Sequence, residues 1–414
     1  MVRLSRILKD YREAGAVNGL LDLWGFVDDT TFLTKAGAVG QVYRLHGVDA
    51  ECLDHIERRQ IGHRFERALR PLDESLRIYQ YVIKRLAAPI TYAAHPHAVV
   101  DGALQRRAAY LAAKADTLFE LDQYLVVLSE RWAAGRRRAT RLSRLRALVT
   151  WFPHALSADH VAAHLTAELD AAVHELHEKA RTFTAQLADT VAPTPLGKQD
   201  AFTFFRRLVN YAPYKVDGIR LKYDTHLDFY TSDSAVDCHR DHLEVDGYRV
   251  KALTMREPPA RTFAGLLYDL CAIPSAFIAC LEWQPLSAAR IRRDIRARQR
   301  HHFNRRISFI NYVSPQTRPE EMLVDDSATA TVHELGESLT ALEVHGHVFG
   351  ACSLTVVAYD RDPVRLETSV AEAIKVFAGH DGALFEESYN LLHTWLAVVP
   401  GNAAHNLRRL ALLN

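Results

Sequence analysis

The sequence has few cysteines, and none of them is close to another. The five cysteines among 414 residues are Cys52, Cys238, Cys271, Cys280 and Cys352. No two of them have the Cys-x-x-Cys spacing of a zinc finger, and their wide separation argues against a disulfide framework. The pattern is typical of reduced thiols in a cytosolic compartment.

A large net charge and a long apolar run are missing as well. Lys and Arg number 51 and Asp and Glu 50, so no overall field favours nucleic acid, which is not predicted as a partner. The N-terminal segment lacks the apolar core of a signal peptide. The most apolar window, Phe263–Trp283, is interrupted by Asp269 and Pro274 and is not expected to span a membrane. The chain is therefore predicted to remain in the cytoplasm.

Motifs of nucleotide chemistry are absent too. Gly197-Lys198 is the nearest approach to a phosphate-binding loop, but Ala192 stands in place of the first glycine and Gln199 in place of the magnesium-binding hydroxyl. The Gly-x-Gly-x-x-Gly, Gly-x-Ser-x-Gly and His-Glu-x-x-His patterns do not occur. We therefore predict no catalytic residue, no cofactor-binding residue and no nucleotide hydrolysis for this chain.

Histidine is abundant, at 21 residues, and raises the question of a metal site. The segment Asp237-Cys238-His239-Arg240-Asp241-His242 concentrates ligand types. On a single strand, however, alternate residues point to opposite faces, so these side chains would not converge. His174 and His177 lie one helical turn apart beside Lys179 and are interpreted as part of a solvated face. No metal ligand is predicted.

Hydrophobic periodicity predicts an α+β fold, with two mixed sheet-and-helix subdomains flanking a helical middle region. Near the N-terminus, a hairpin with its turn at Lys35-Ala36-Gly37 precedes two helices that alternate with strands, and both helices are expected on one face of the sheet. A second hairpin turns at Asp246-Gly247, and a later helix is capped by Asp362. The predicted regions are a first α+β subdomain (1–130), an Arg-rich helical middle (131–211), a second α+β subdomain (212–399) and a junction (400–414).

Two further patterns concern the middle region and the two mixed halves. From Leu169 onwards, the apolar residues of a long helix follow a heptad-like spacing, which fits either a projecting arm or a core helix of a compact domain. Both mixed halves also show the order hairpin, helix, strand, helix, strand. We state an internal structural duplication as a hypothesis, which two strand arrangements of unrelated topology would contradict.

Two arginine-rich runs stand out against the neutral charge balance. The first interleaves arginines with aromatic residues and would be amphipathic as a helix, which fits a membrane-surface or partner-docking element. Its candidate contact residues are Arg136, Arg137, Arg138, Arg141, Arg144, Trp132 and Trp151. The second run extends from Arg290 to Arg306. For both runs, the alternative is a solvated helix face that pairs with acids elsewhere.

The last stretch of the chain opens with a helix breaker. In Pro400-Gly401-Asn402, proline lacks the amide donor and glycine tolerates positive φ, so the preceding helix must end here. Arg408 and Arg409 follow in a segment that starts a new element shortly before Asn414. We expect this stretch to be a junction within a longer protein whose chemical part lies beyond Asn414.

Several of these segments resemble the N-terminal part of the TrbE/CagE-type ATPases, the motor subunits of type IV secretion and conjugation machines. The resembling segments are Phe32–Leu45, Leu76–Lys84, Leu121–Val127 and, most specifically, Trp395–Asn402 with Asn406–Arg409. The last of them resembles the family's junction before its RecA-like motor domain. The family's nucleotide-binding loop lies downstream of that junction and has no counterpart here.

The resemblance implies an N-terminal assembly and docking domain at the cytoplasmic face of the bacterial inner membrane, serving substrate transport and pilus biogenesis. It implies ATP and magnesium for the missing motor domain and no cofactor in this chain. The implied partners are other inner-membrane components of the secretion system, the ATPase domain of the same protein, and further copies of the protein. The alternative is a stand-alone binder of anionic membrane surfaces or nucleic acid through the arginine runs, and a third possibility is an enzyme with an unrecognised His/Asp site.

Overall fold

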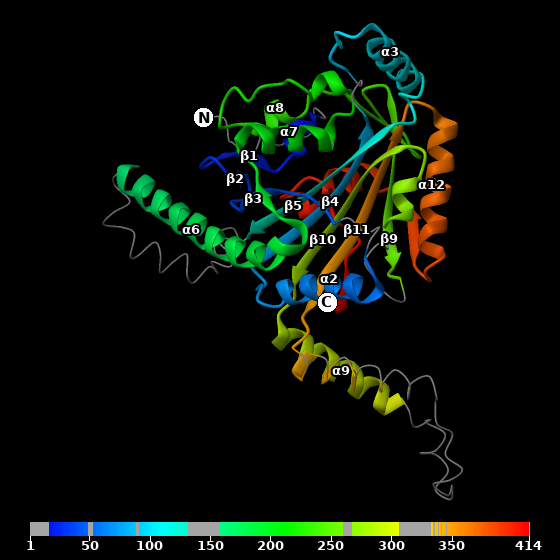
Figure 1. Ribbon diagram of the computed structural model, residues 1–414. Helices are drawn as coiled ribbons and strands as arrows, with labels where there is room; N and C mark the ends of the chain where they lie inside the picture. The colour runs from blue at the N-terminus through cyan, green and yellow to red at the C-terminus, as the bar shows by residue number, and fades with distance from the viewer. Residues whose placement is uncertain are drawn as a thin grey trace, which may run out of the picture.

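A computed structural model places one large twisted sheet at the centre of the molecule, with helices on both of its faces (Figure 1). The α+β class is therefore confirmed. The structure describes residues 16–48, 53–87, 91–130, 158–259, 267–305, part of 333–344, and 346–413.

The described part of the first mixed region alternates strands with helices. Its elements are β1 (Leu23–Phe26), β2 (Thr31–Thr34), β3 (Val39–Leu45), α2 (His55–Leu69), β4 (Leu76–Leu86), α3 (Ala98–Ala112) and β5 (Phe119–Ser129). The predicted β2–β3 hairpin is confirmed, and its turn contains Gly37 with a φ of 89°, a conformation that glycine adopts without a Cβ clash. Helix α2 begins at a capping box formed by Asp54 and Glu57.

The two helices of this region differ in their packing. Helix α2 contacts α6 (Ala158–Val191) and buries Ala68. Helix α3 has no buried residue, so the expectation that both helices cover the sheet is wrong for α3. Half of its apolar residues are alanines and it contains the exposed pair Arg106 and Arg107, so docking it on the sheet would remove less apolar area from water than docking a leucine-rich helix.

The remaining described elements form the middle and the second mixed region. The helices are α6, α7 (Lys198–Val209), α8 (Leu227–Thr231), α9 (Ala288–Arg305), α12 (Pro363–Ala378) and α13 (Leu391–Ala397), and the strands are β6 (Thr194–Pro195), β7 (Val236–Cys238), β8 (Leu243–Val245), β9 (Tyr248–Glu257), β10 (Ala276–Pro285), β11 (Phe349–Asp360), β12 (Ala383–Glu386) and β13 (Leu410–Leu413). The predicted turn at Asp246-Gly247 is confirmed, with φ values of 56° and 74°. Asp362 caps α12 as predicted, by accepting a hydrogen bond from the Val364 amide.

Strands from both mixed regions belong to the same sheet. Its order is β1-β2-β3-β5-β4-β10-β11-β9-β8-β7, with β6 beside β3, β12 beside β9 and β13 beside β11. At its centre, β4 pairs antiparallel with β10 from Lys84 opposite Phe277 to Ile78 opposite Trp283. The segments on either side of the predicted boundaries at residues 130, 211 and 399 therefore contribute strands to one continuous sheet.

The two halves of the sheet have the same topology. In the first half, β2-β3-β5-β4 lie in this spatial order and β6 joins β3; in the second, β8-β9-β11-β10 lie in the same order and β12 joins β9. The two halves meet at β4 and β10, which are equivalent strands and pair antiparallel. This is the arrangement that a pseudo-twofold axis between the two halves would produce. The topology agrees with the hypothesis of an internal duplication.

The helices that cover the two faces of the sheet also correspond between the two halves. Because side chains alternate along a strand, Tyr79 and Tyr81 of β4 belong to the apolar core that includes α7 and α13. Ile78 belongs to the core on the other face, which includes α6 and α12. Each face is thus covered by at least one helix from each half, and α8 adds Leu227 to the first core and α2 adds Ala68 to the second.

Helix α6 combines the two arrangements considered for it. Its C-terminal half is a core helix, with its buried apolar side chains at Leu176, Ala180, Phe183 and Leu187. Its N-terminal half extends beyond the edge of the sheet (Figure 1), where most of its described side chains are exposed. Among the described helices, none has an apolar stretch long enough to cross a bilayer.

Candidate functional site at the C-terminal junction

The predicted junction is packed into the fold. After α13, the chain turns at Gly401 and continues through a short 3-10 helix, Asn402–His405, into β13, which pairs with the start of β11. Gly401 has a φ of 94°, and a Cβ at this position would lie 3.0 Å from Cγ2 of Thr34. Glycine is therefore needed here for its conformation and for the close approach to β2.

Asn402 connects the junction to the N-terminal segment. Its side-chain oxygen accepts a hydrogen bond from the Asp22 amide at 2.8 Å, and its side-chain nitrogen donates to the carbonyls of Leu20 and Leu396, both at 3.1 Å. The residue is 2% exposed, so these hydrogen bonds replace those that a buried amide would otherwise lose. The sequence indicated a helix breaker at this position but not the residues that it contacts.

The two predicted junction arginines bind buried carboxylates. Arg408 Nε lies 2.8 Å from Oε1 of Glu387, and this hydrogen bond raises the pKa of the guanidinium. Arg409 Nη2 lies 3.0 Å from Oε1 of Glu282 in the middle of β10. Asn406 donates to the other oxygen of Glu282 at 2.8 Å. The C-terminal segment is thus held through charged hydrogen bonds to strand β10 and to Glu387, which directly follows β12.

Glu282 also pairs with Arg77 of the neighbouring strand β4. Burial lowers the pKa of the Arg77 guanidinium, but Tyr79, Glu130 and Glu282 raise it above its ordinary value. The Arg77 Nε atom lies 2.9 Å from Glu130 Oε1. The buried charges therefore form one network across the β4–β10 pair, where the two halves of the sheet meet. The donors and carboxylates of this network are paired with one another. Its role is therefore to fix the C-terminal segment to the sheet.

The candidate contact residues of the first arginine run lie outside the described residues. These are Arg136, Arg137, Arg138, Arg141, Arg144, Trp132 and Trp151. Their role as a partner or membrane contact stays a prediction.

The second arginine run forms α9, which projects from one end of the sheet (Figure 1). Its described arginines are exposed. Arg290 lies 3.9 Å from Asp294 within the helix, and Arg296 lies 3.2 Å from Glu343. The helix is thus a solvated, basic element with two exposed ion pairs of small energetic value.

A cavity of about 350 Å³ lies at the α3 end of the sheet. The sequence did not indicate it. Its wall contains four arginines and three stacked or edge-on tyrosines: Arg85, Arg207, Arg361, Arg365, Tyr211, Tyr248 and Tyr359. Arg365 binds Asp360 through two nitrogens, both at 2.8 Å, and Arg85 binds Asp122 at 3.0 Å. Arg207 is likewise paired with Asp122, whereas Arg361 lies over the Tyr248 ring. The lining residues come from segments too distant in sequence to form a motif.

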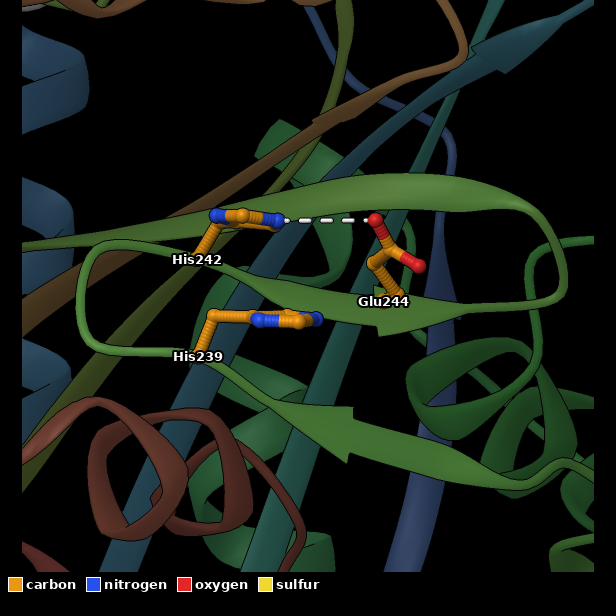
Figure 2. A group of neighbouring side chains, drawn as sticks. All are labelled: His239, His242 and Glu244. Carbon is orange, nitrogen blue, oxygen red and sulfur yellow. Dashed lines mark ion pairs between the residues drawn. The ribbon is translucent and has the colours of Figure 1, made fainter.

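The histidine-rich segment adopts a different conformation from the one predicted. It forms a hairpin of β7 and β8 in place of one strand, so the argument that its side chains alternate on a single strand is wrong. The turn brings His239 beside His242, and Glu244 follows on β8 (Figure 2). This cluster lies on the opposite edge of the sheet from β1, away from the junction.

Comparison with known families adds an independent observation. Residues 30–136 match the family model described as type IV secretion system ATPase VirB4/TrbE, N-terminal domain. This region is therefore similar to a VirB4/TrbE N-terminal domain. No curated protein matches the chain. The predicted resemblance is confirmed for the matched region, which covers β2 to β5, four strands of the first half of the sheet. The resemblance of Trp395–Asn402 to the family's motor junction lies outside the match and stays a prediction.

Proposed function

We propose that this chain is the assembly and docking part of a type IV secretion ATPase, whose ATP- and magnesium-dependent motor is a separate domain joined at the C-terminal segment. The observation that carries the proposal is the VirB4/TrbE match over 30–136, within a sheet that also holds the C-terminal segment. Because β13 is a strand of this sheet, a motor attached there would be coupled directly to the docking region. The proposal includes self-association and peripheral binding to inner-membrane components.

A competition experiment tests this function. The chain is expressed in a bacterium that carries the complete secretion system, and substrate transfer to recipient cells is counted. The isolated chain should occupy the docking sites of the intact ATPase, lower transfer at least tenfold, and co-purify with inner-membrane components after cross-linking. Unchanged transfer together with no co-purified component would overturn the proposal.

A matched variant makes the competition specific. Arg77→Met breaks the buried network at the centre of the sheet and should abolish the inhibition at equal expression, because it destabilises the docking fold. The same substitution at the exposed Arg107 should leave the inhibition intact. Equal inhibition by all three proteins would show that overexpression alone lowers transfer and would count against docking.

The exposed arginines of α9 favour a second candidate function, binding to an anionic membrane surface. Flotation of the chain with vesicles of neutral phosphatidylcholine, with and without anionic phosphatidylserine, measures it. The double variant Arg292→Glu and Arg293→Glu should weaken binding to anionic vesicles, and raised salt should do the same. The control is Arg106→Glu and Arg107→Glu on α3, which changes the net charge equally. Equal loss in both double variants would show a general charge effect and exclude α9 as the contact.

The predicted first run is tested in the same assay through Arg136→Glu, Arg137→Glu and Arg138→Glu. If these changes abolish flotation while the α9 variant floats normally, the membrane contact belongs to the first run.

A further inference from the structure

The hairpin at the outer edge of the sheet collects metal-ligand side chains on one face. Asp237 of β7 is directly opposite Glu244 of β8, and the His239 amide donates to the His242 carbonyl at 3.0 Å. Since side chains alternate along each strand, His242 and Glu244 share a face. The residue between them, Leu243, is 1% exposed and belongs to the core on the other side. The hairpin therefore separates ligand types from apolar side chains.

Three of these side chains lie close enough together to reach a single ion after a small movement. The rings of His239 and His242 are stacked with centroids 4.5 Å apart and an angle of 12° between them. One ligand atom from each of His239, His242 and Glu244 lies within 4.8 Å of the other two. Figure 2 shows the two rings side by side and the Glu244 carboxylate facing the His242 ring. Ligand atoms of a tetrahedral zinc site are about 3.3 Å apart for bonds of about 2.0 Å, so a small movement would close the site.

The hydrogen bonds of His242 leave one ring nitrogen for an ion. Nδ1 lies 2.9 Å from Oδ1 of Asp241, and a neutral imidazole that donates there carries its lone pair on Nε2. This Nε2 is buried without a hydrogen-bond partner and lies 3.5 Å from Oε1 of Glu244. A lone pair facing a carboxylate oxygen is unfavourable unless a cation lies between them. A carboxylate that orients the far nitrogen of a ligating histidine is also a common feature of zinc sites.

Nearby arginines leave the site accessible to a metal ion. Arg249 Nε is 3.9 Å from Oε1 of Glu244, and both side chains are almost half exposed, so this ion pair is weak. Arg240 donates to the Tyr389 hydroxyl at 2.9 Å and lies over the Tyr389 ring. Its guanidinium is therefore engaged away from the histidines.

We propose that His239, His242 and Glu244 bind a divalent transition-metal ion of the zinc class at the β7–β8 hairpin. Two imidazole nitrogens and one carboxylate oxygen suit zinc, whereas magnesium and calcium prefer oxygen ligands alone. Three protein ligands leave a fourth position for water or for Asp237, which is opposite Glu244 in the hairpin register. The ion cross-links the two strands at the exposed edge of the sheet.

Calorimetric titration of the metal-free chain with zinc chloride tests the site. We expect one zinc per chain and no binding of magnesium under the same conditions. His239→Ala and His242→Ala should each remove stoichiometric binding. Asp241→Asn should retain the stoichiometry but lower the affinity about 10–100-fold, because Asp241 positions the His242 ring without touching the metal.

A second pair of stacked histidines provides the matched control. His393 and His405 have ring centroids 5.0 Å apart, and His393→Ala should leave zinc binding unchanged. Unfolding in urea without metal is compared for every variant, so that loss of binding is separated from loss of folding. Absence of zinc binding by the wild-type chain, or stoichiometric zinc in the folded His239→Ala and His242→Ala variants, would overturn the proposal.

Cobalt provides a spectroscopic readout of the ligand set. Visible absorption of the cobalt-loaded chain should have the intensity of a tetrahedral site and should disappear in His242→Ala. It should lack a thiolate charge-transfer band, since the proposed ligands include no cysteine. A strong thiolate band that vanishes in Cys238→Ser would replace the proposed ligand set and contradict the assignment.

Discussion

Asn402 accepts a hydrogen bond from the backbone amide of Asp22 at 2.8 Å, although 380 residues separate them in sequence. The contact links the predicted junction to the segment that precedes β1. A load applied at the C-terminal segment would therefore reach both the first strands and, through Arg409 and Glu282, the centre of the sheet. This linkage gives the junction a structural role that can be measured through stability.

Asn402→Ala should lower the free energy of unfolding by about 1–3 kcal/mol, because it leaves the Asp22 amide and two carbonyls without their buried partner. Urea unfolding followed by tryptophan fluorescence measures the change. Asn390→Ala is the control, since Asn390 is half-buried and its side-chain nitrogen donates to Thr394 at 3.2 Å. A loss at Asn390 equal to that at Asn402 would contradict a special role for the junction asparagine.

Arg77→Met should destabilise the protein by about 3–5 kcal/mol, because it leaves the half-buried Glu130 without its cation and the buried Glu282 with Arg409 alone. Arg85→Met on the same strand is the control and should cost less, since its partner Asp122 keeps Arg44 and Arg207. Both values come from urea unfolding. An equal loss in the free energy of unfolding for both variants would show that the network at the β4–β10 pair contributes no more to stability than the ion pairs of Arg85.

Gly401→Ala should destabilise the fold more than Gly218→Ala. Both glycines have positive φ, a backbone conformation that costs about 1–2 kcal/mol when a Cβ is present. The methyl added at Gly401 would contact Thr34, whereas the methyl added at Gly218 would lie in open space. Thermal unfolding of the two variants isolates the contact. Thr34→Ser removes the Cγ2 atom and should recover part of the loss in the Gly401→Ala background; no recovery would argue against this close approach.

Asp246 should contribute stability that acid removes. Burial raises its pKa, but hydrogen bonds from Lys215, Ser234 and the amides of Tyr211 and Ala212 outweigh burial and hold the pKa below its usual value. Because the folded pKa is lowered, this stability is present above about pH 4 and is lost as the pH falls through the folded pKa. Asp246→Asn should therefore destabilise the protein at pH 7 and differ less from wild type near pH 3.

The measurement for Asp246 is urea unfolding across this pH range. Asp29→Asn is the control, since Asp29 is 96% exposed, and it should leave the free energy of unfolding nearly unchanged. A difference between Asp246→Asn and wild type that does not vary with pH would show that the hydrogen bonds of Asp246 do not favour the charged carboxylate.

Local chemistry explains which parts of the fold the sequence predicted. The turns at Gly37 and Asp246-Gly247 and the cap at Asp362 depend on residues within a few positions of one another, and all three are confirmed. The exposed state of α3 was not predicted, because the order of strands and helices does not show how little apolar area its alanines and arginines offer to the sheet. The site residues were predicted less completely: the sequence indicated the junction, but Glu282, Glu387 and Asp22 are distant partners with no signal of their own.

The sequence by itself determined the α+β class, both hairpins, the junction turn and the resemblance that the match over 30–136 supports. Only the tertiary structure showed that β4 and β10 join the two halves, because strand pairing between distant segments has no local signature. It also decided that His239 and His242 face each other. Their segment contains no glycine or proline to indicate a turn, and the choice between one strand and a hairpin depends on the core that Leu243 and Val245 enter.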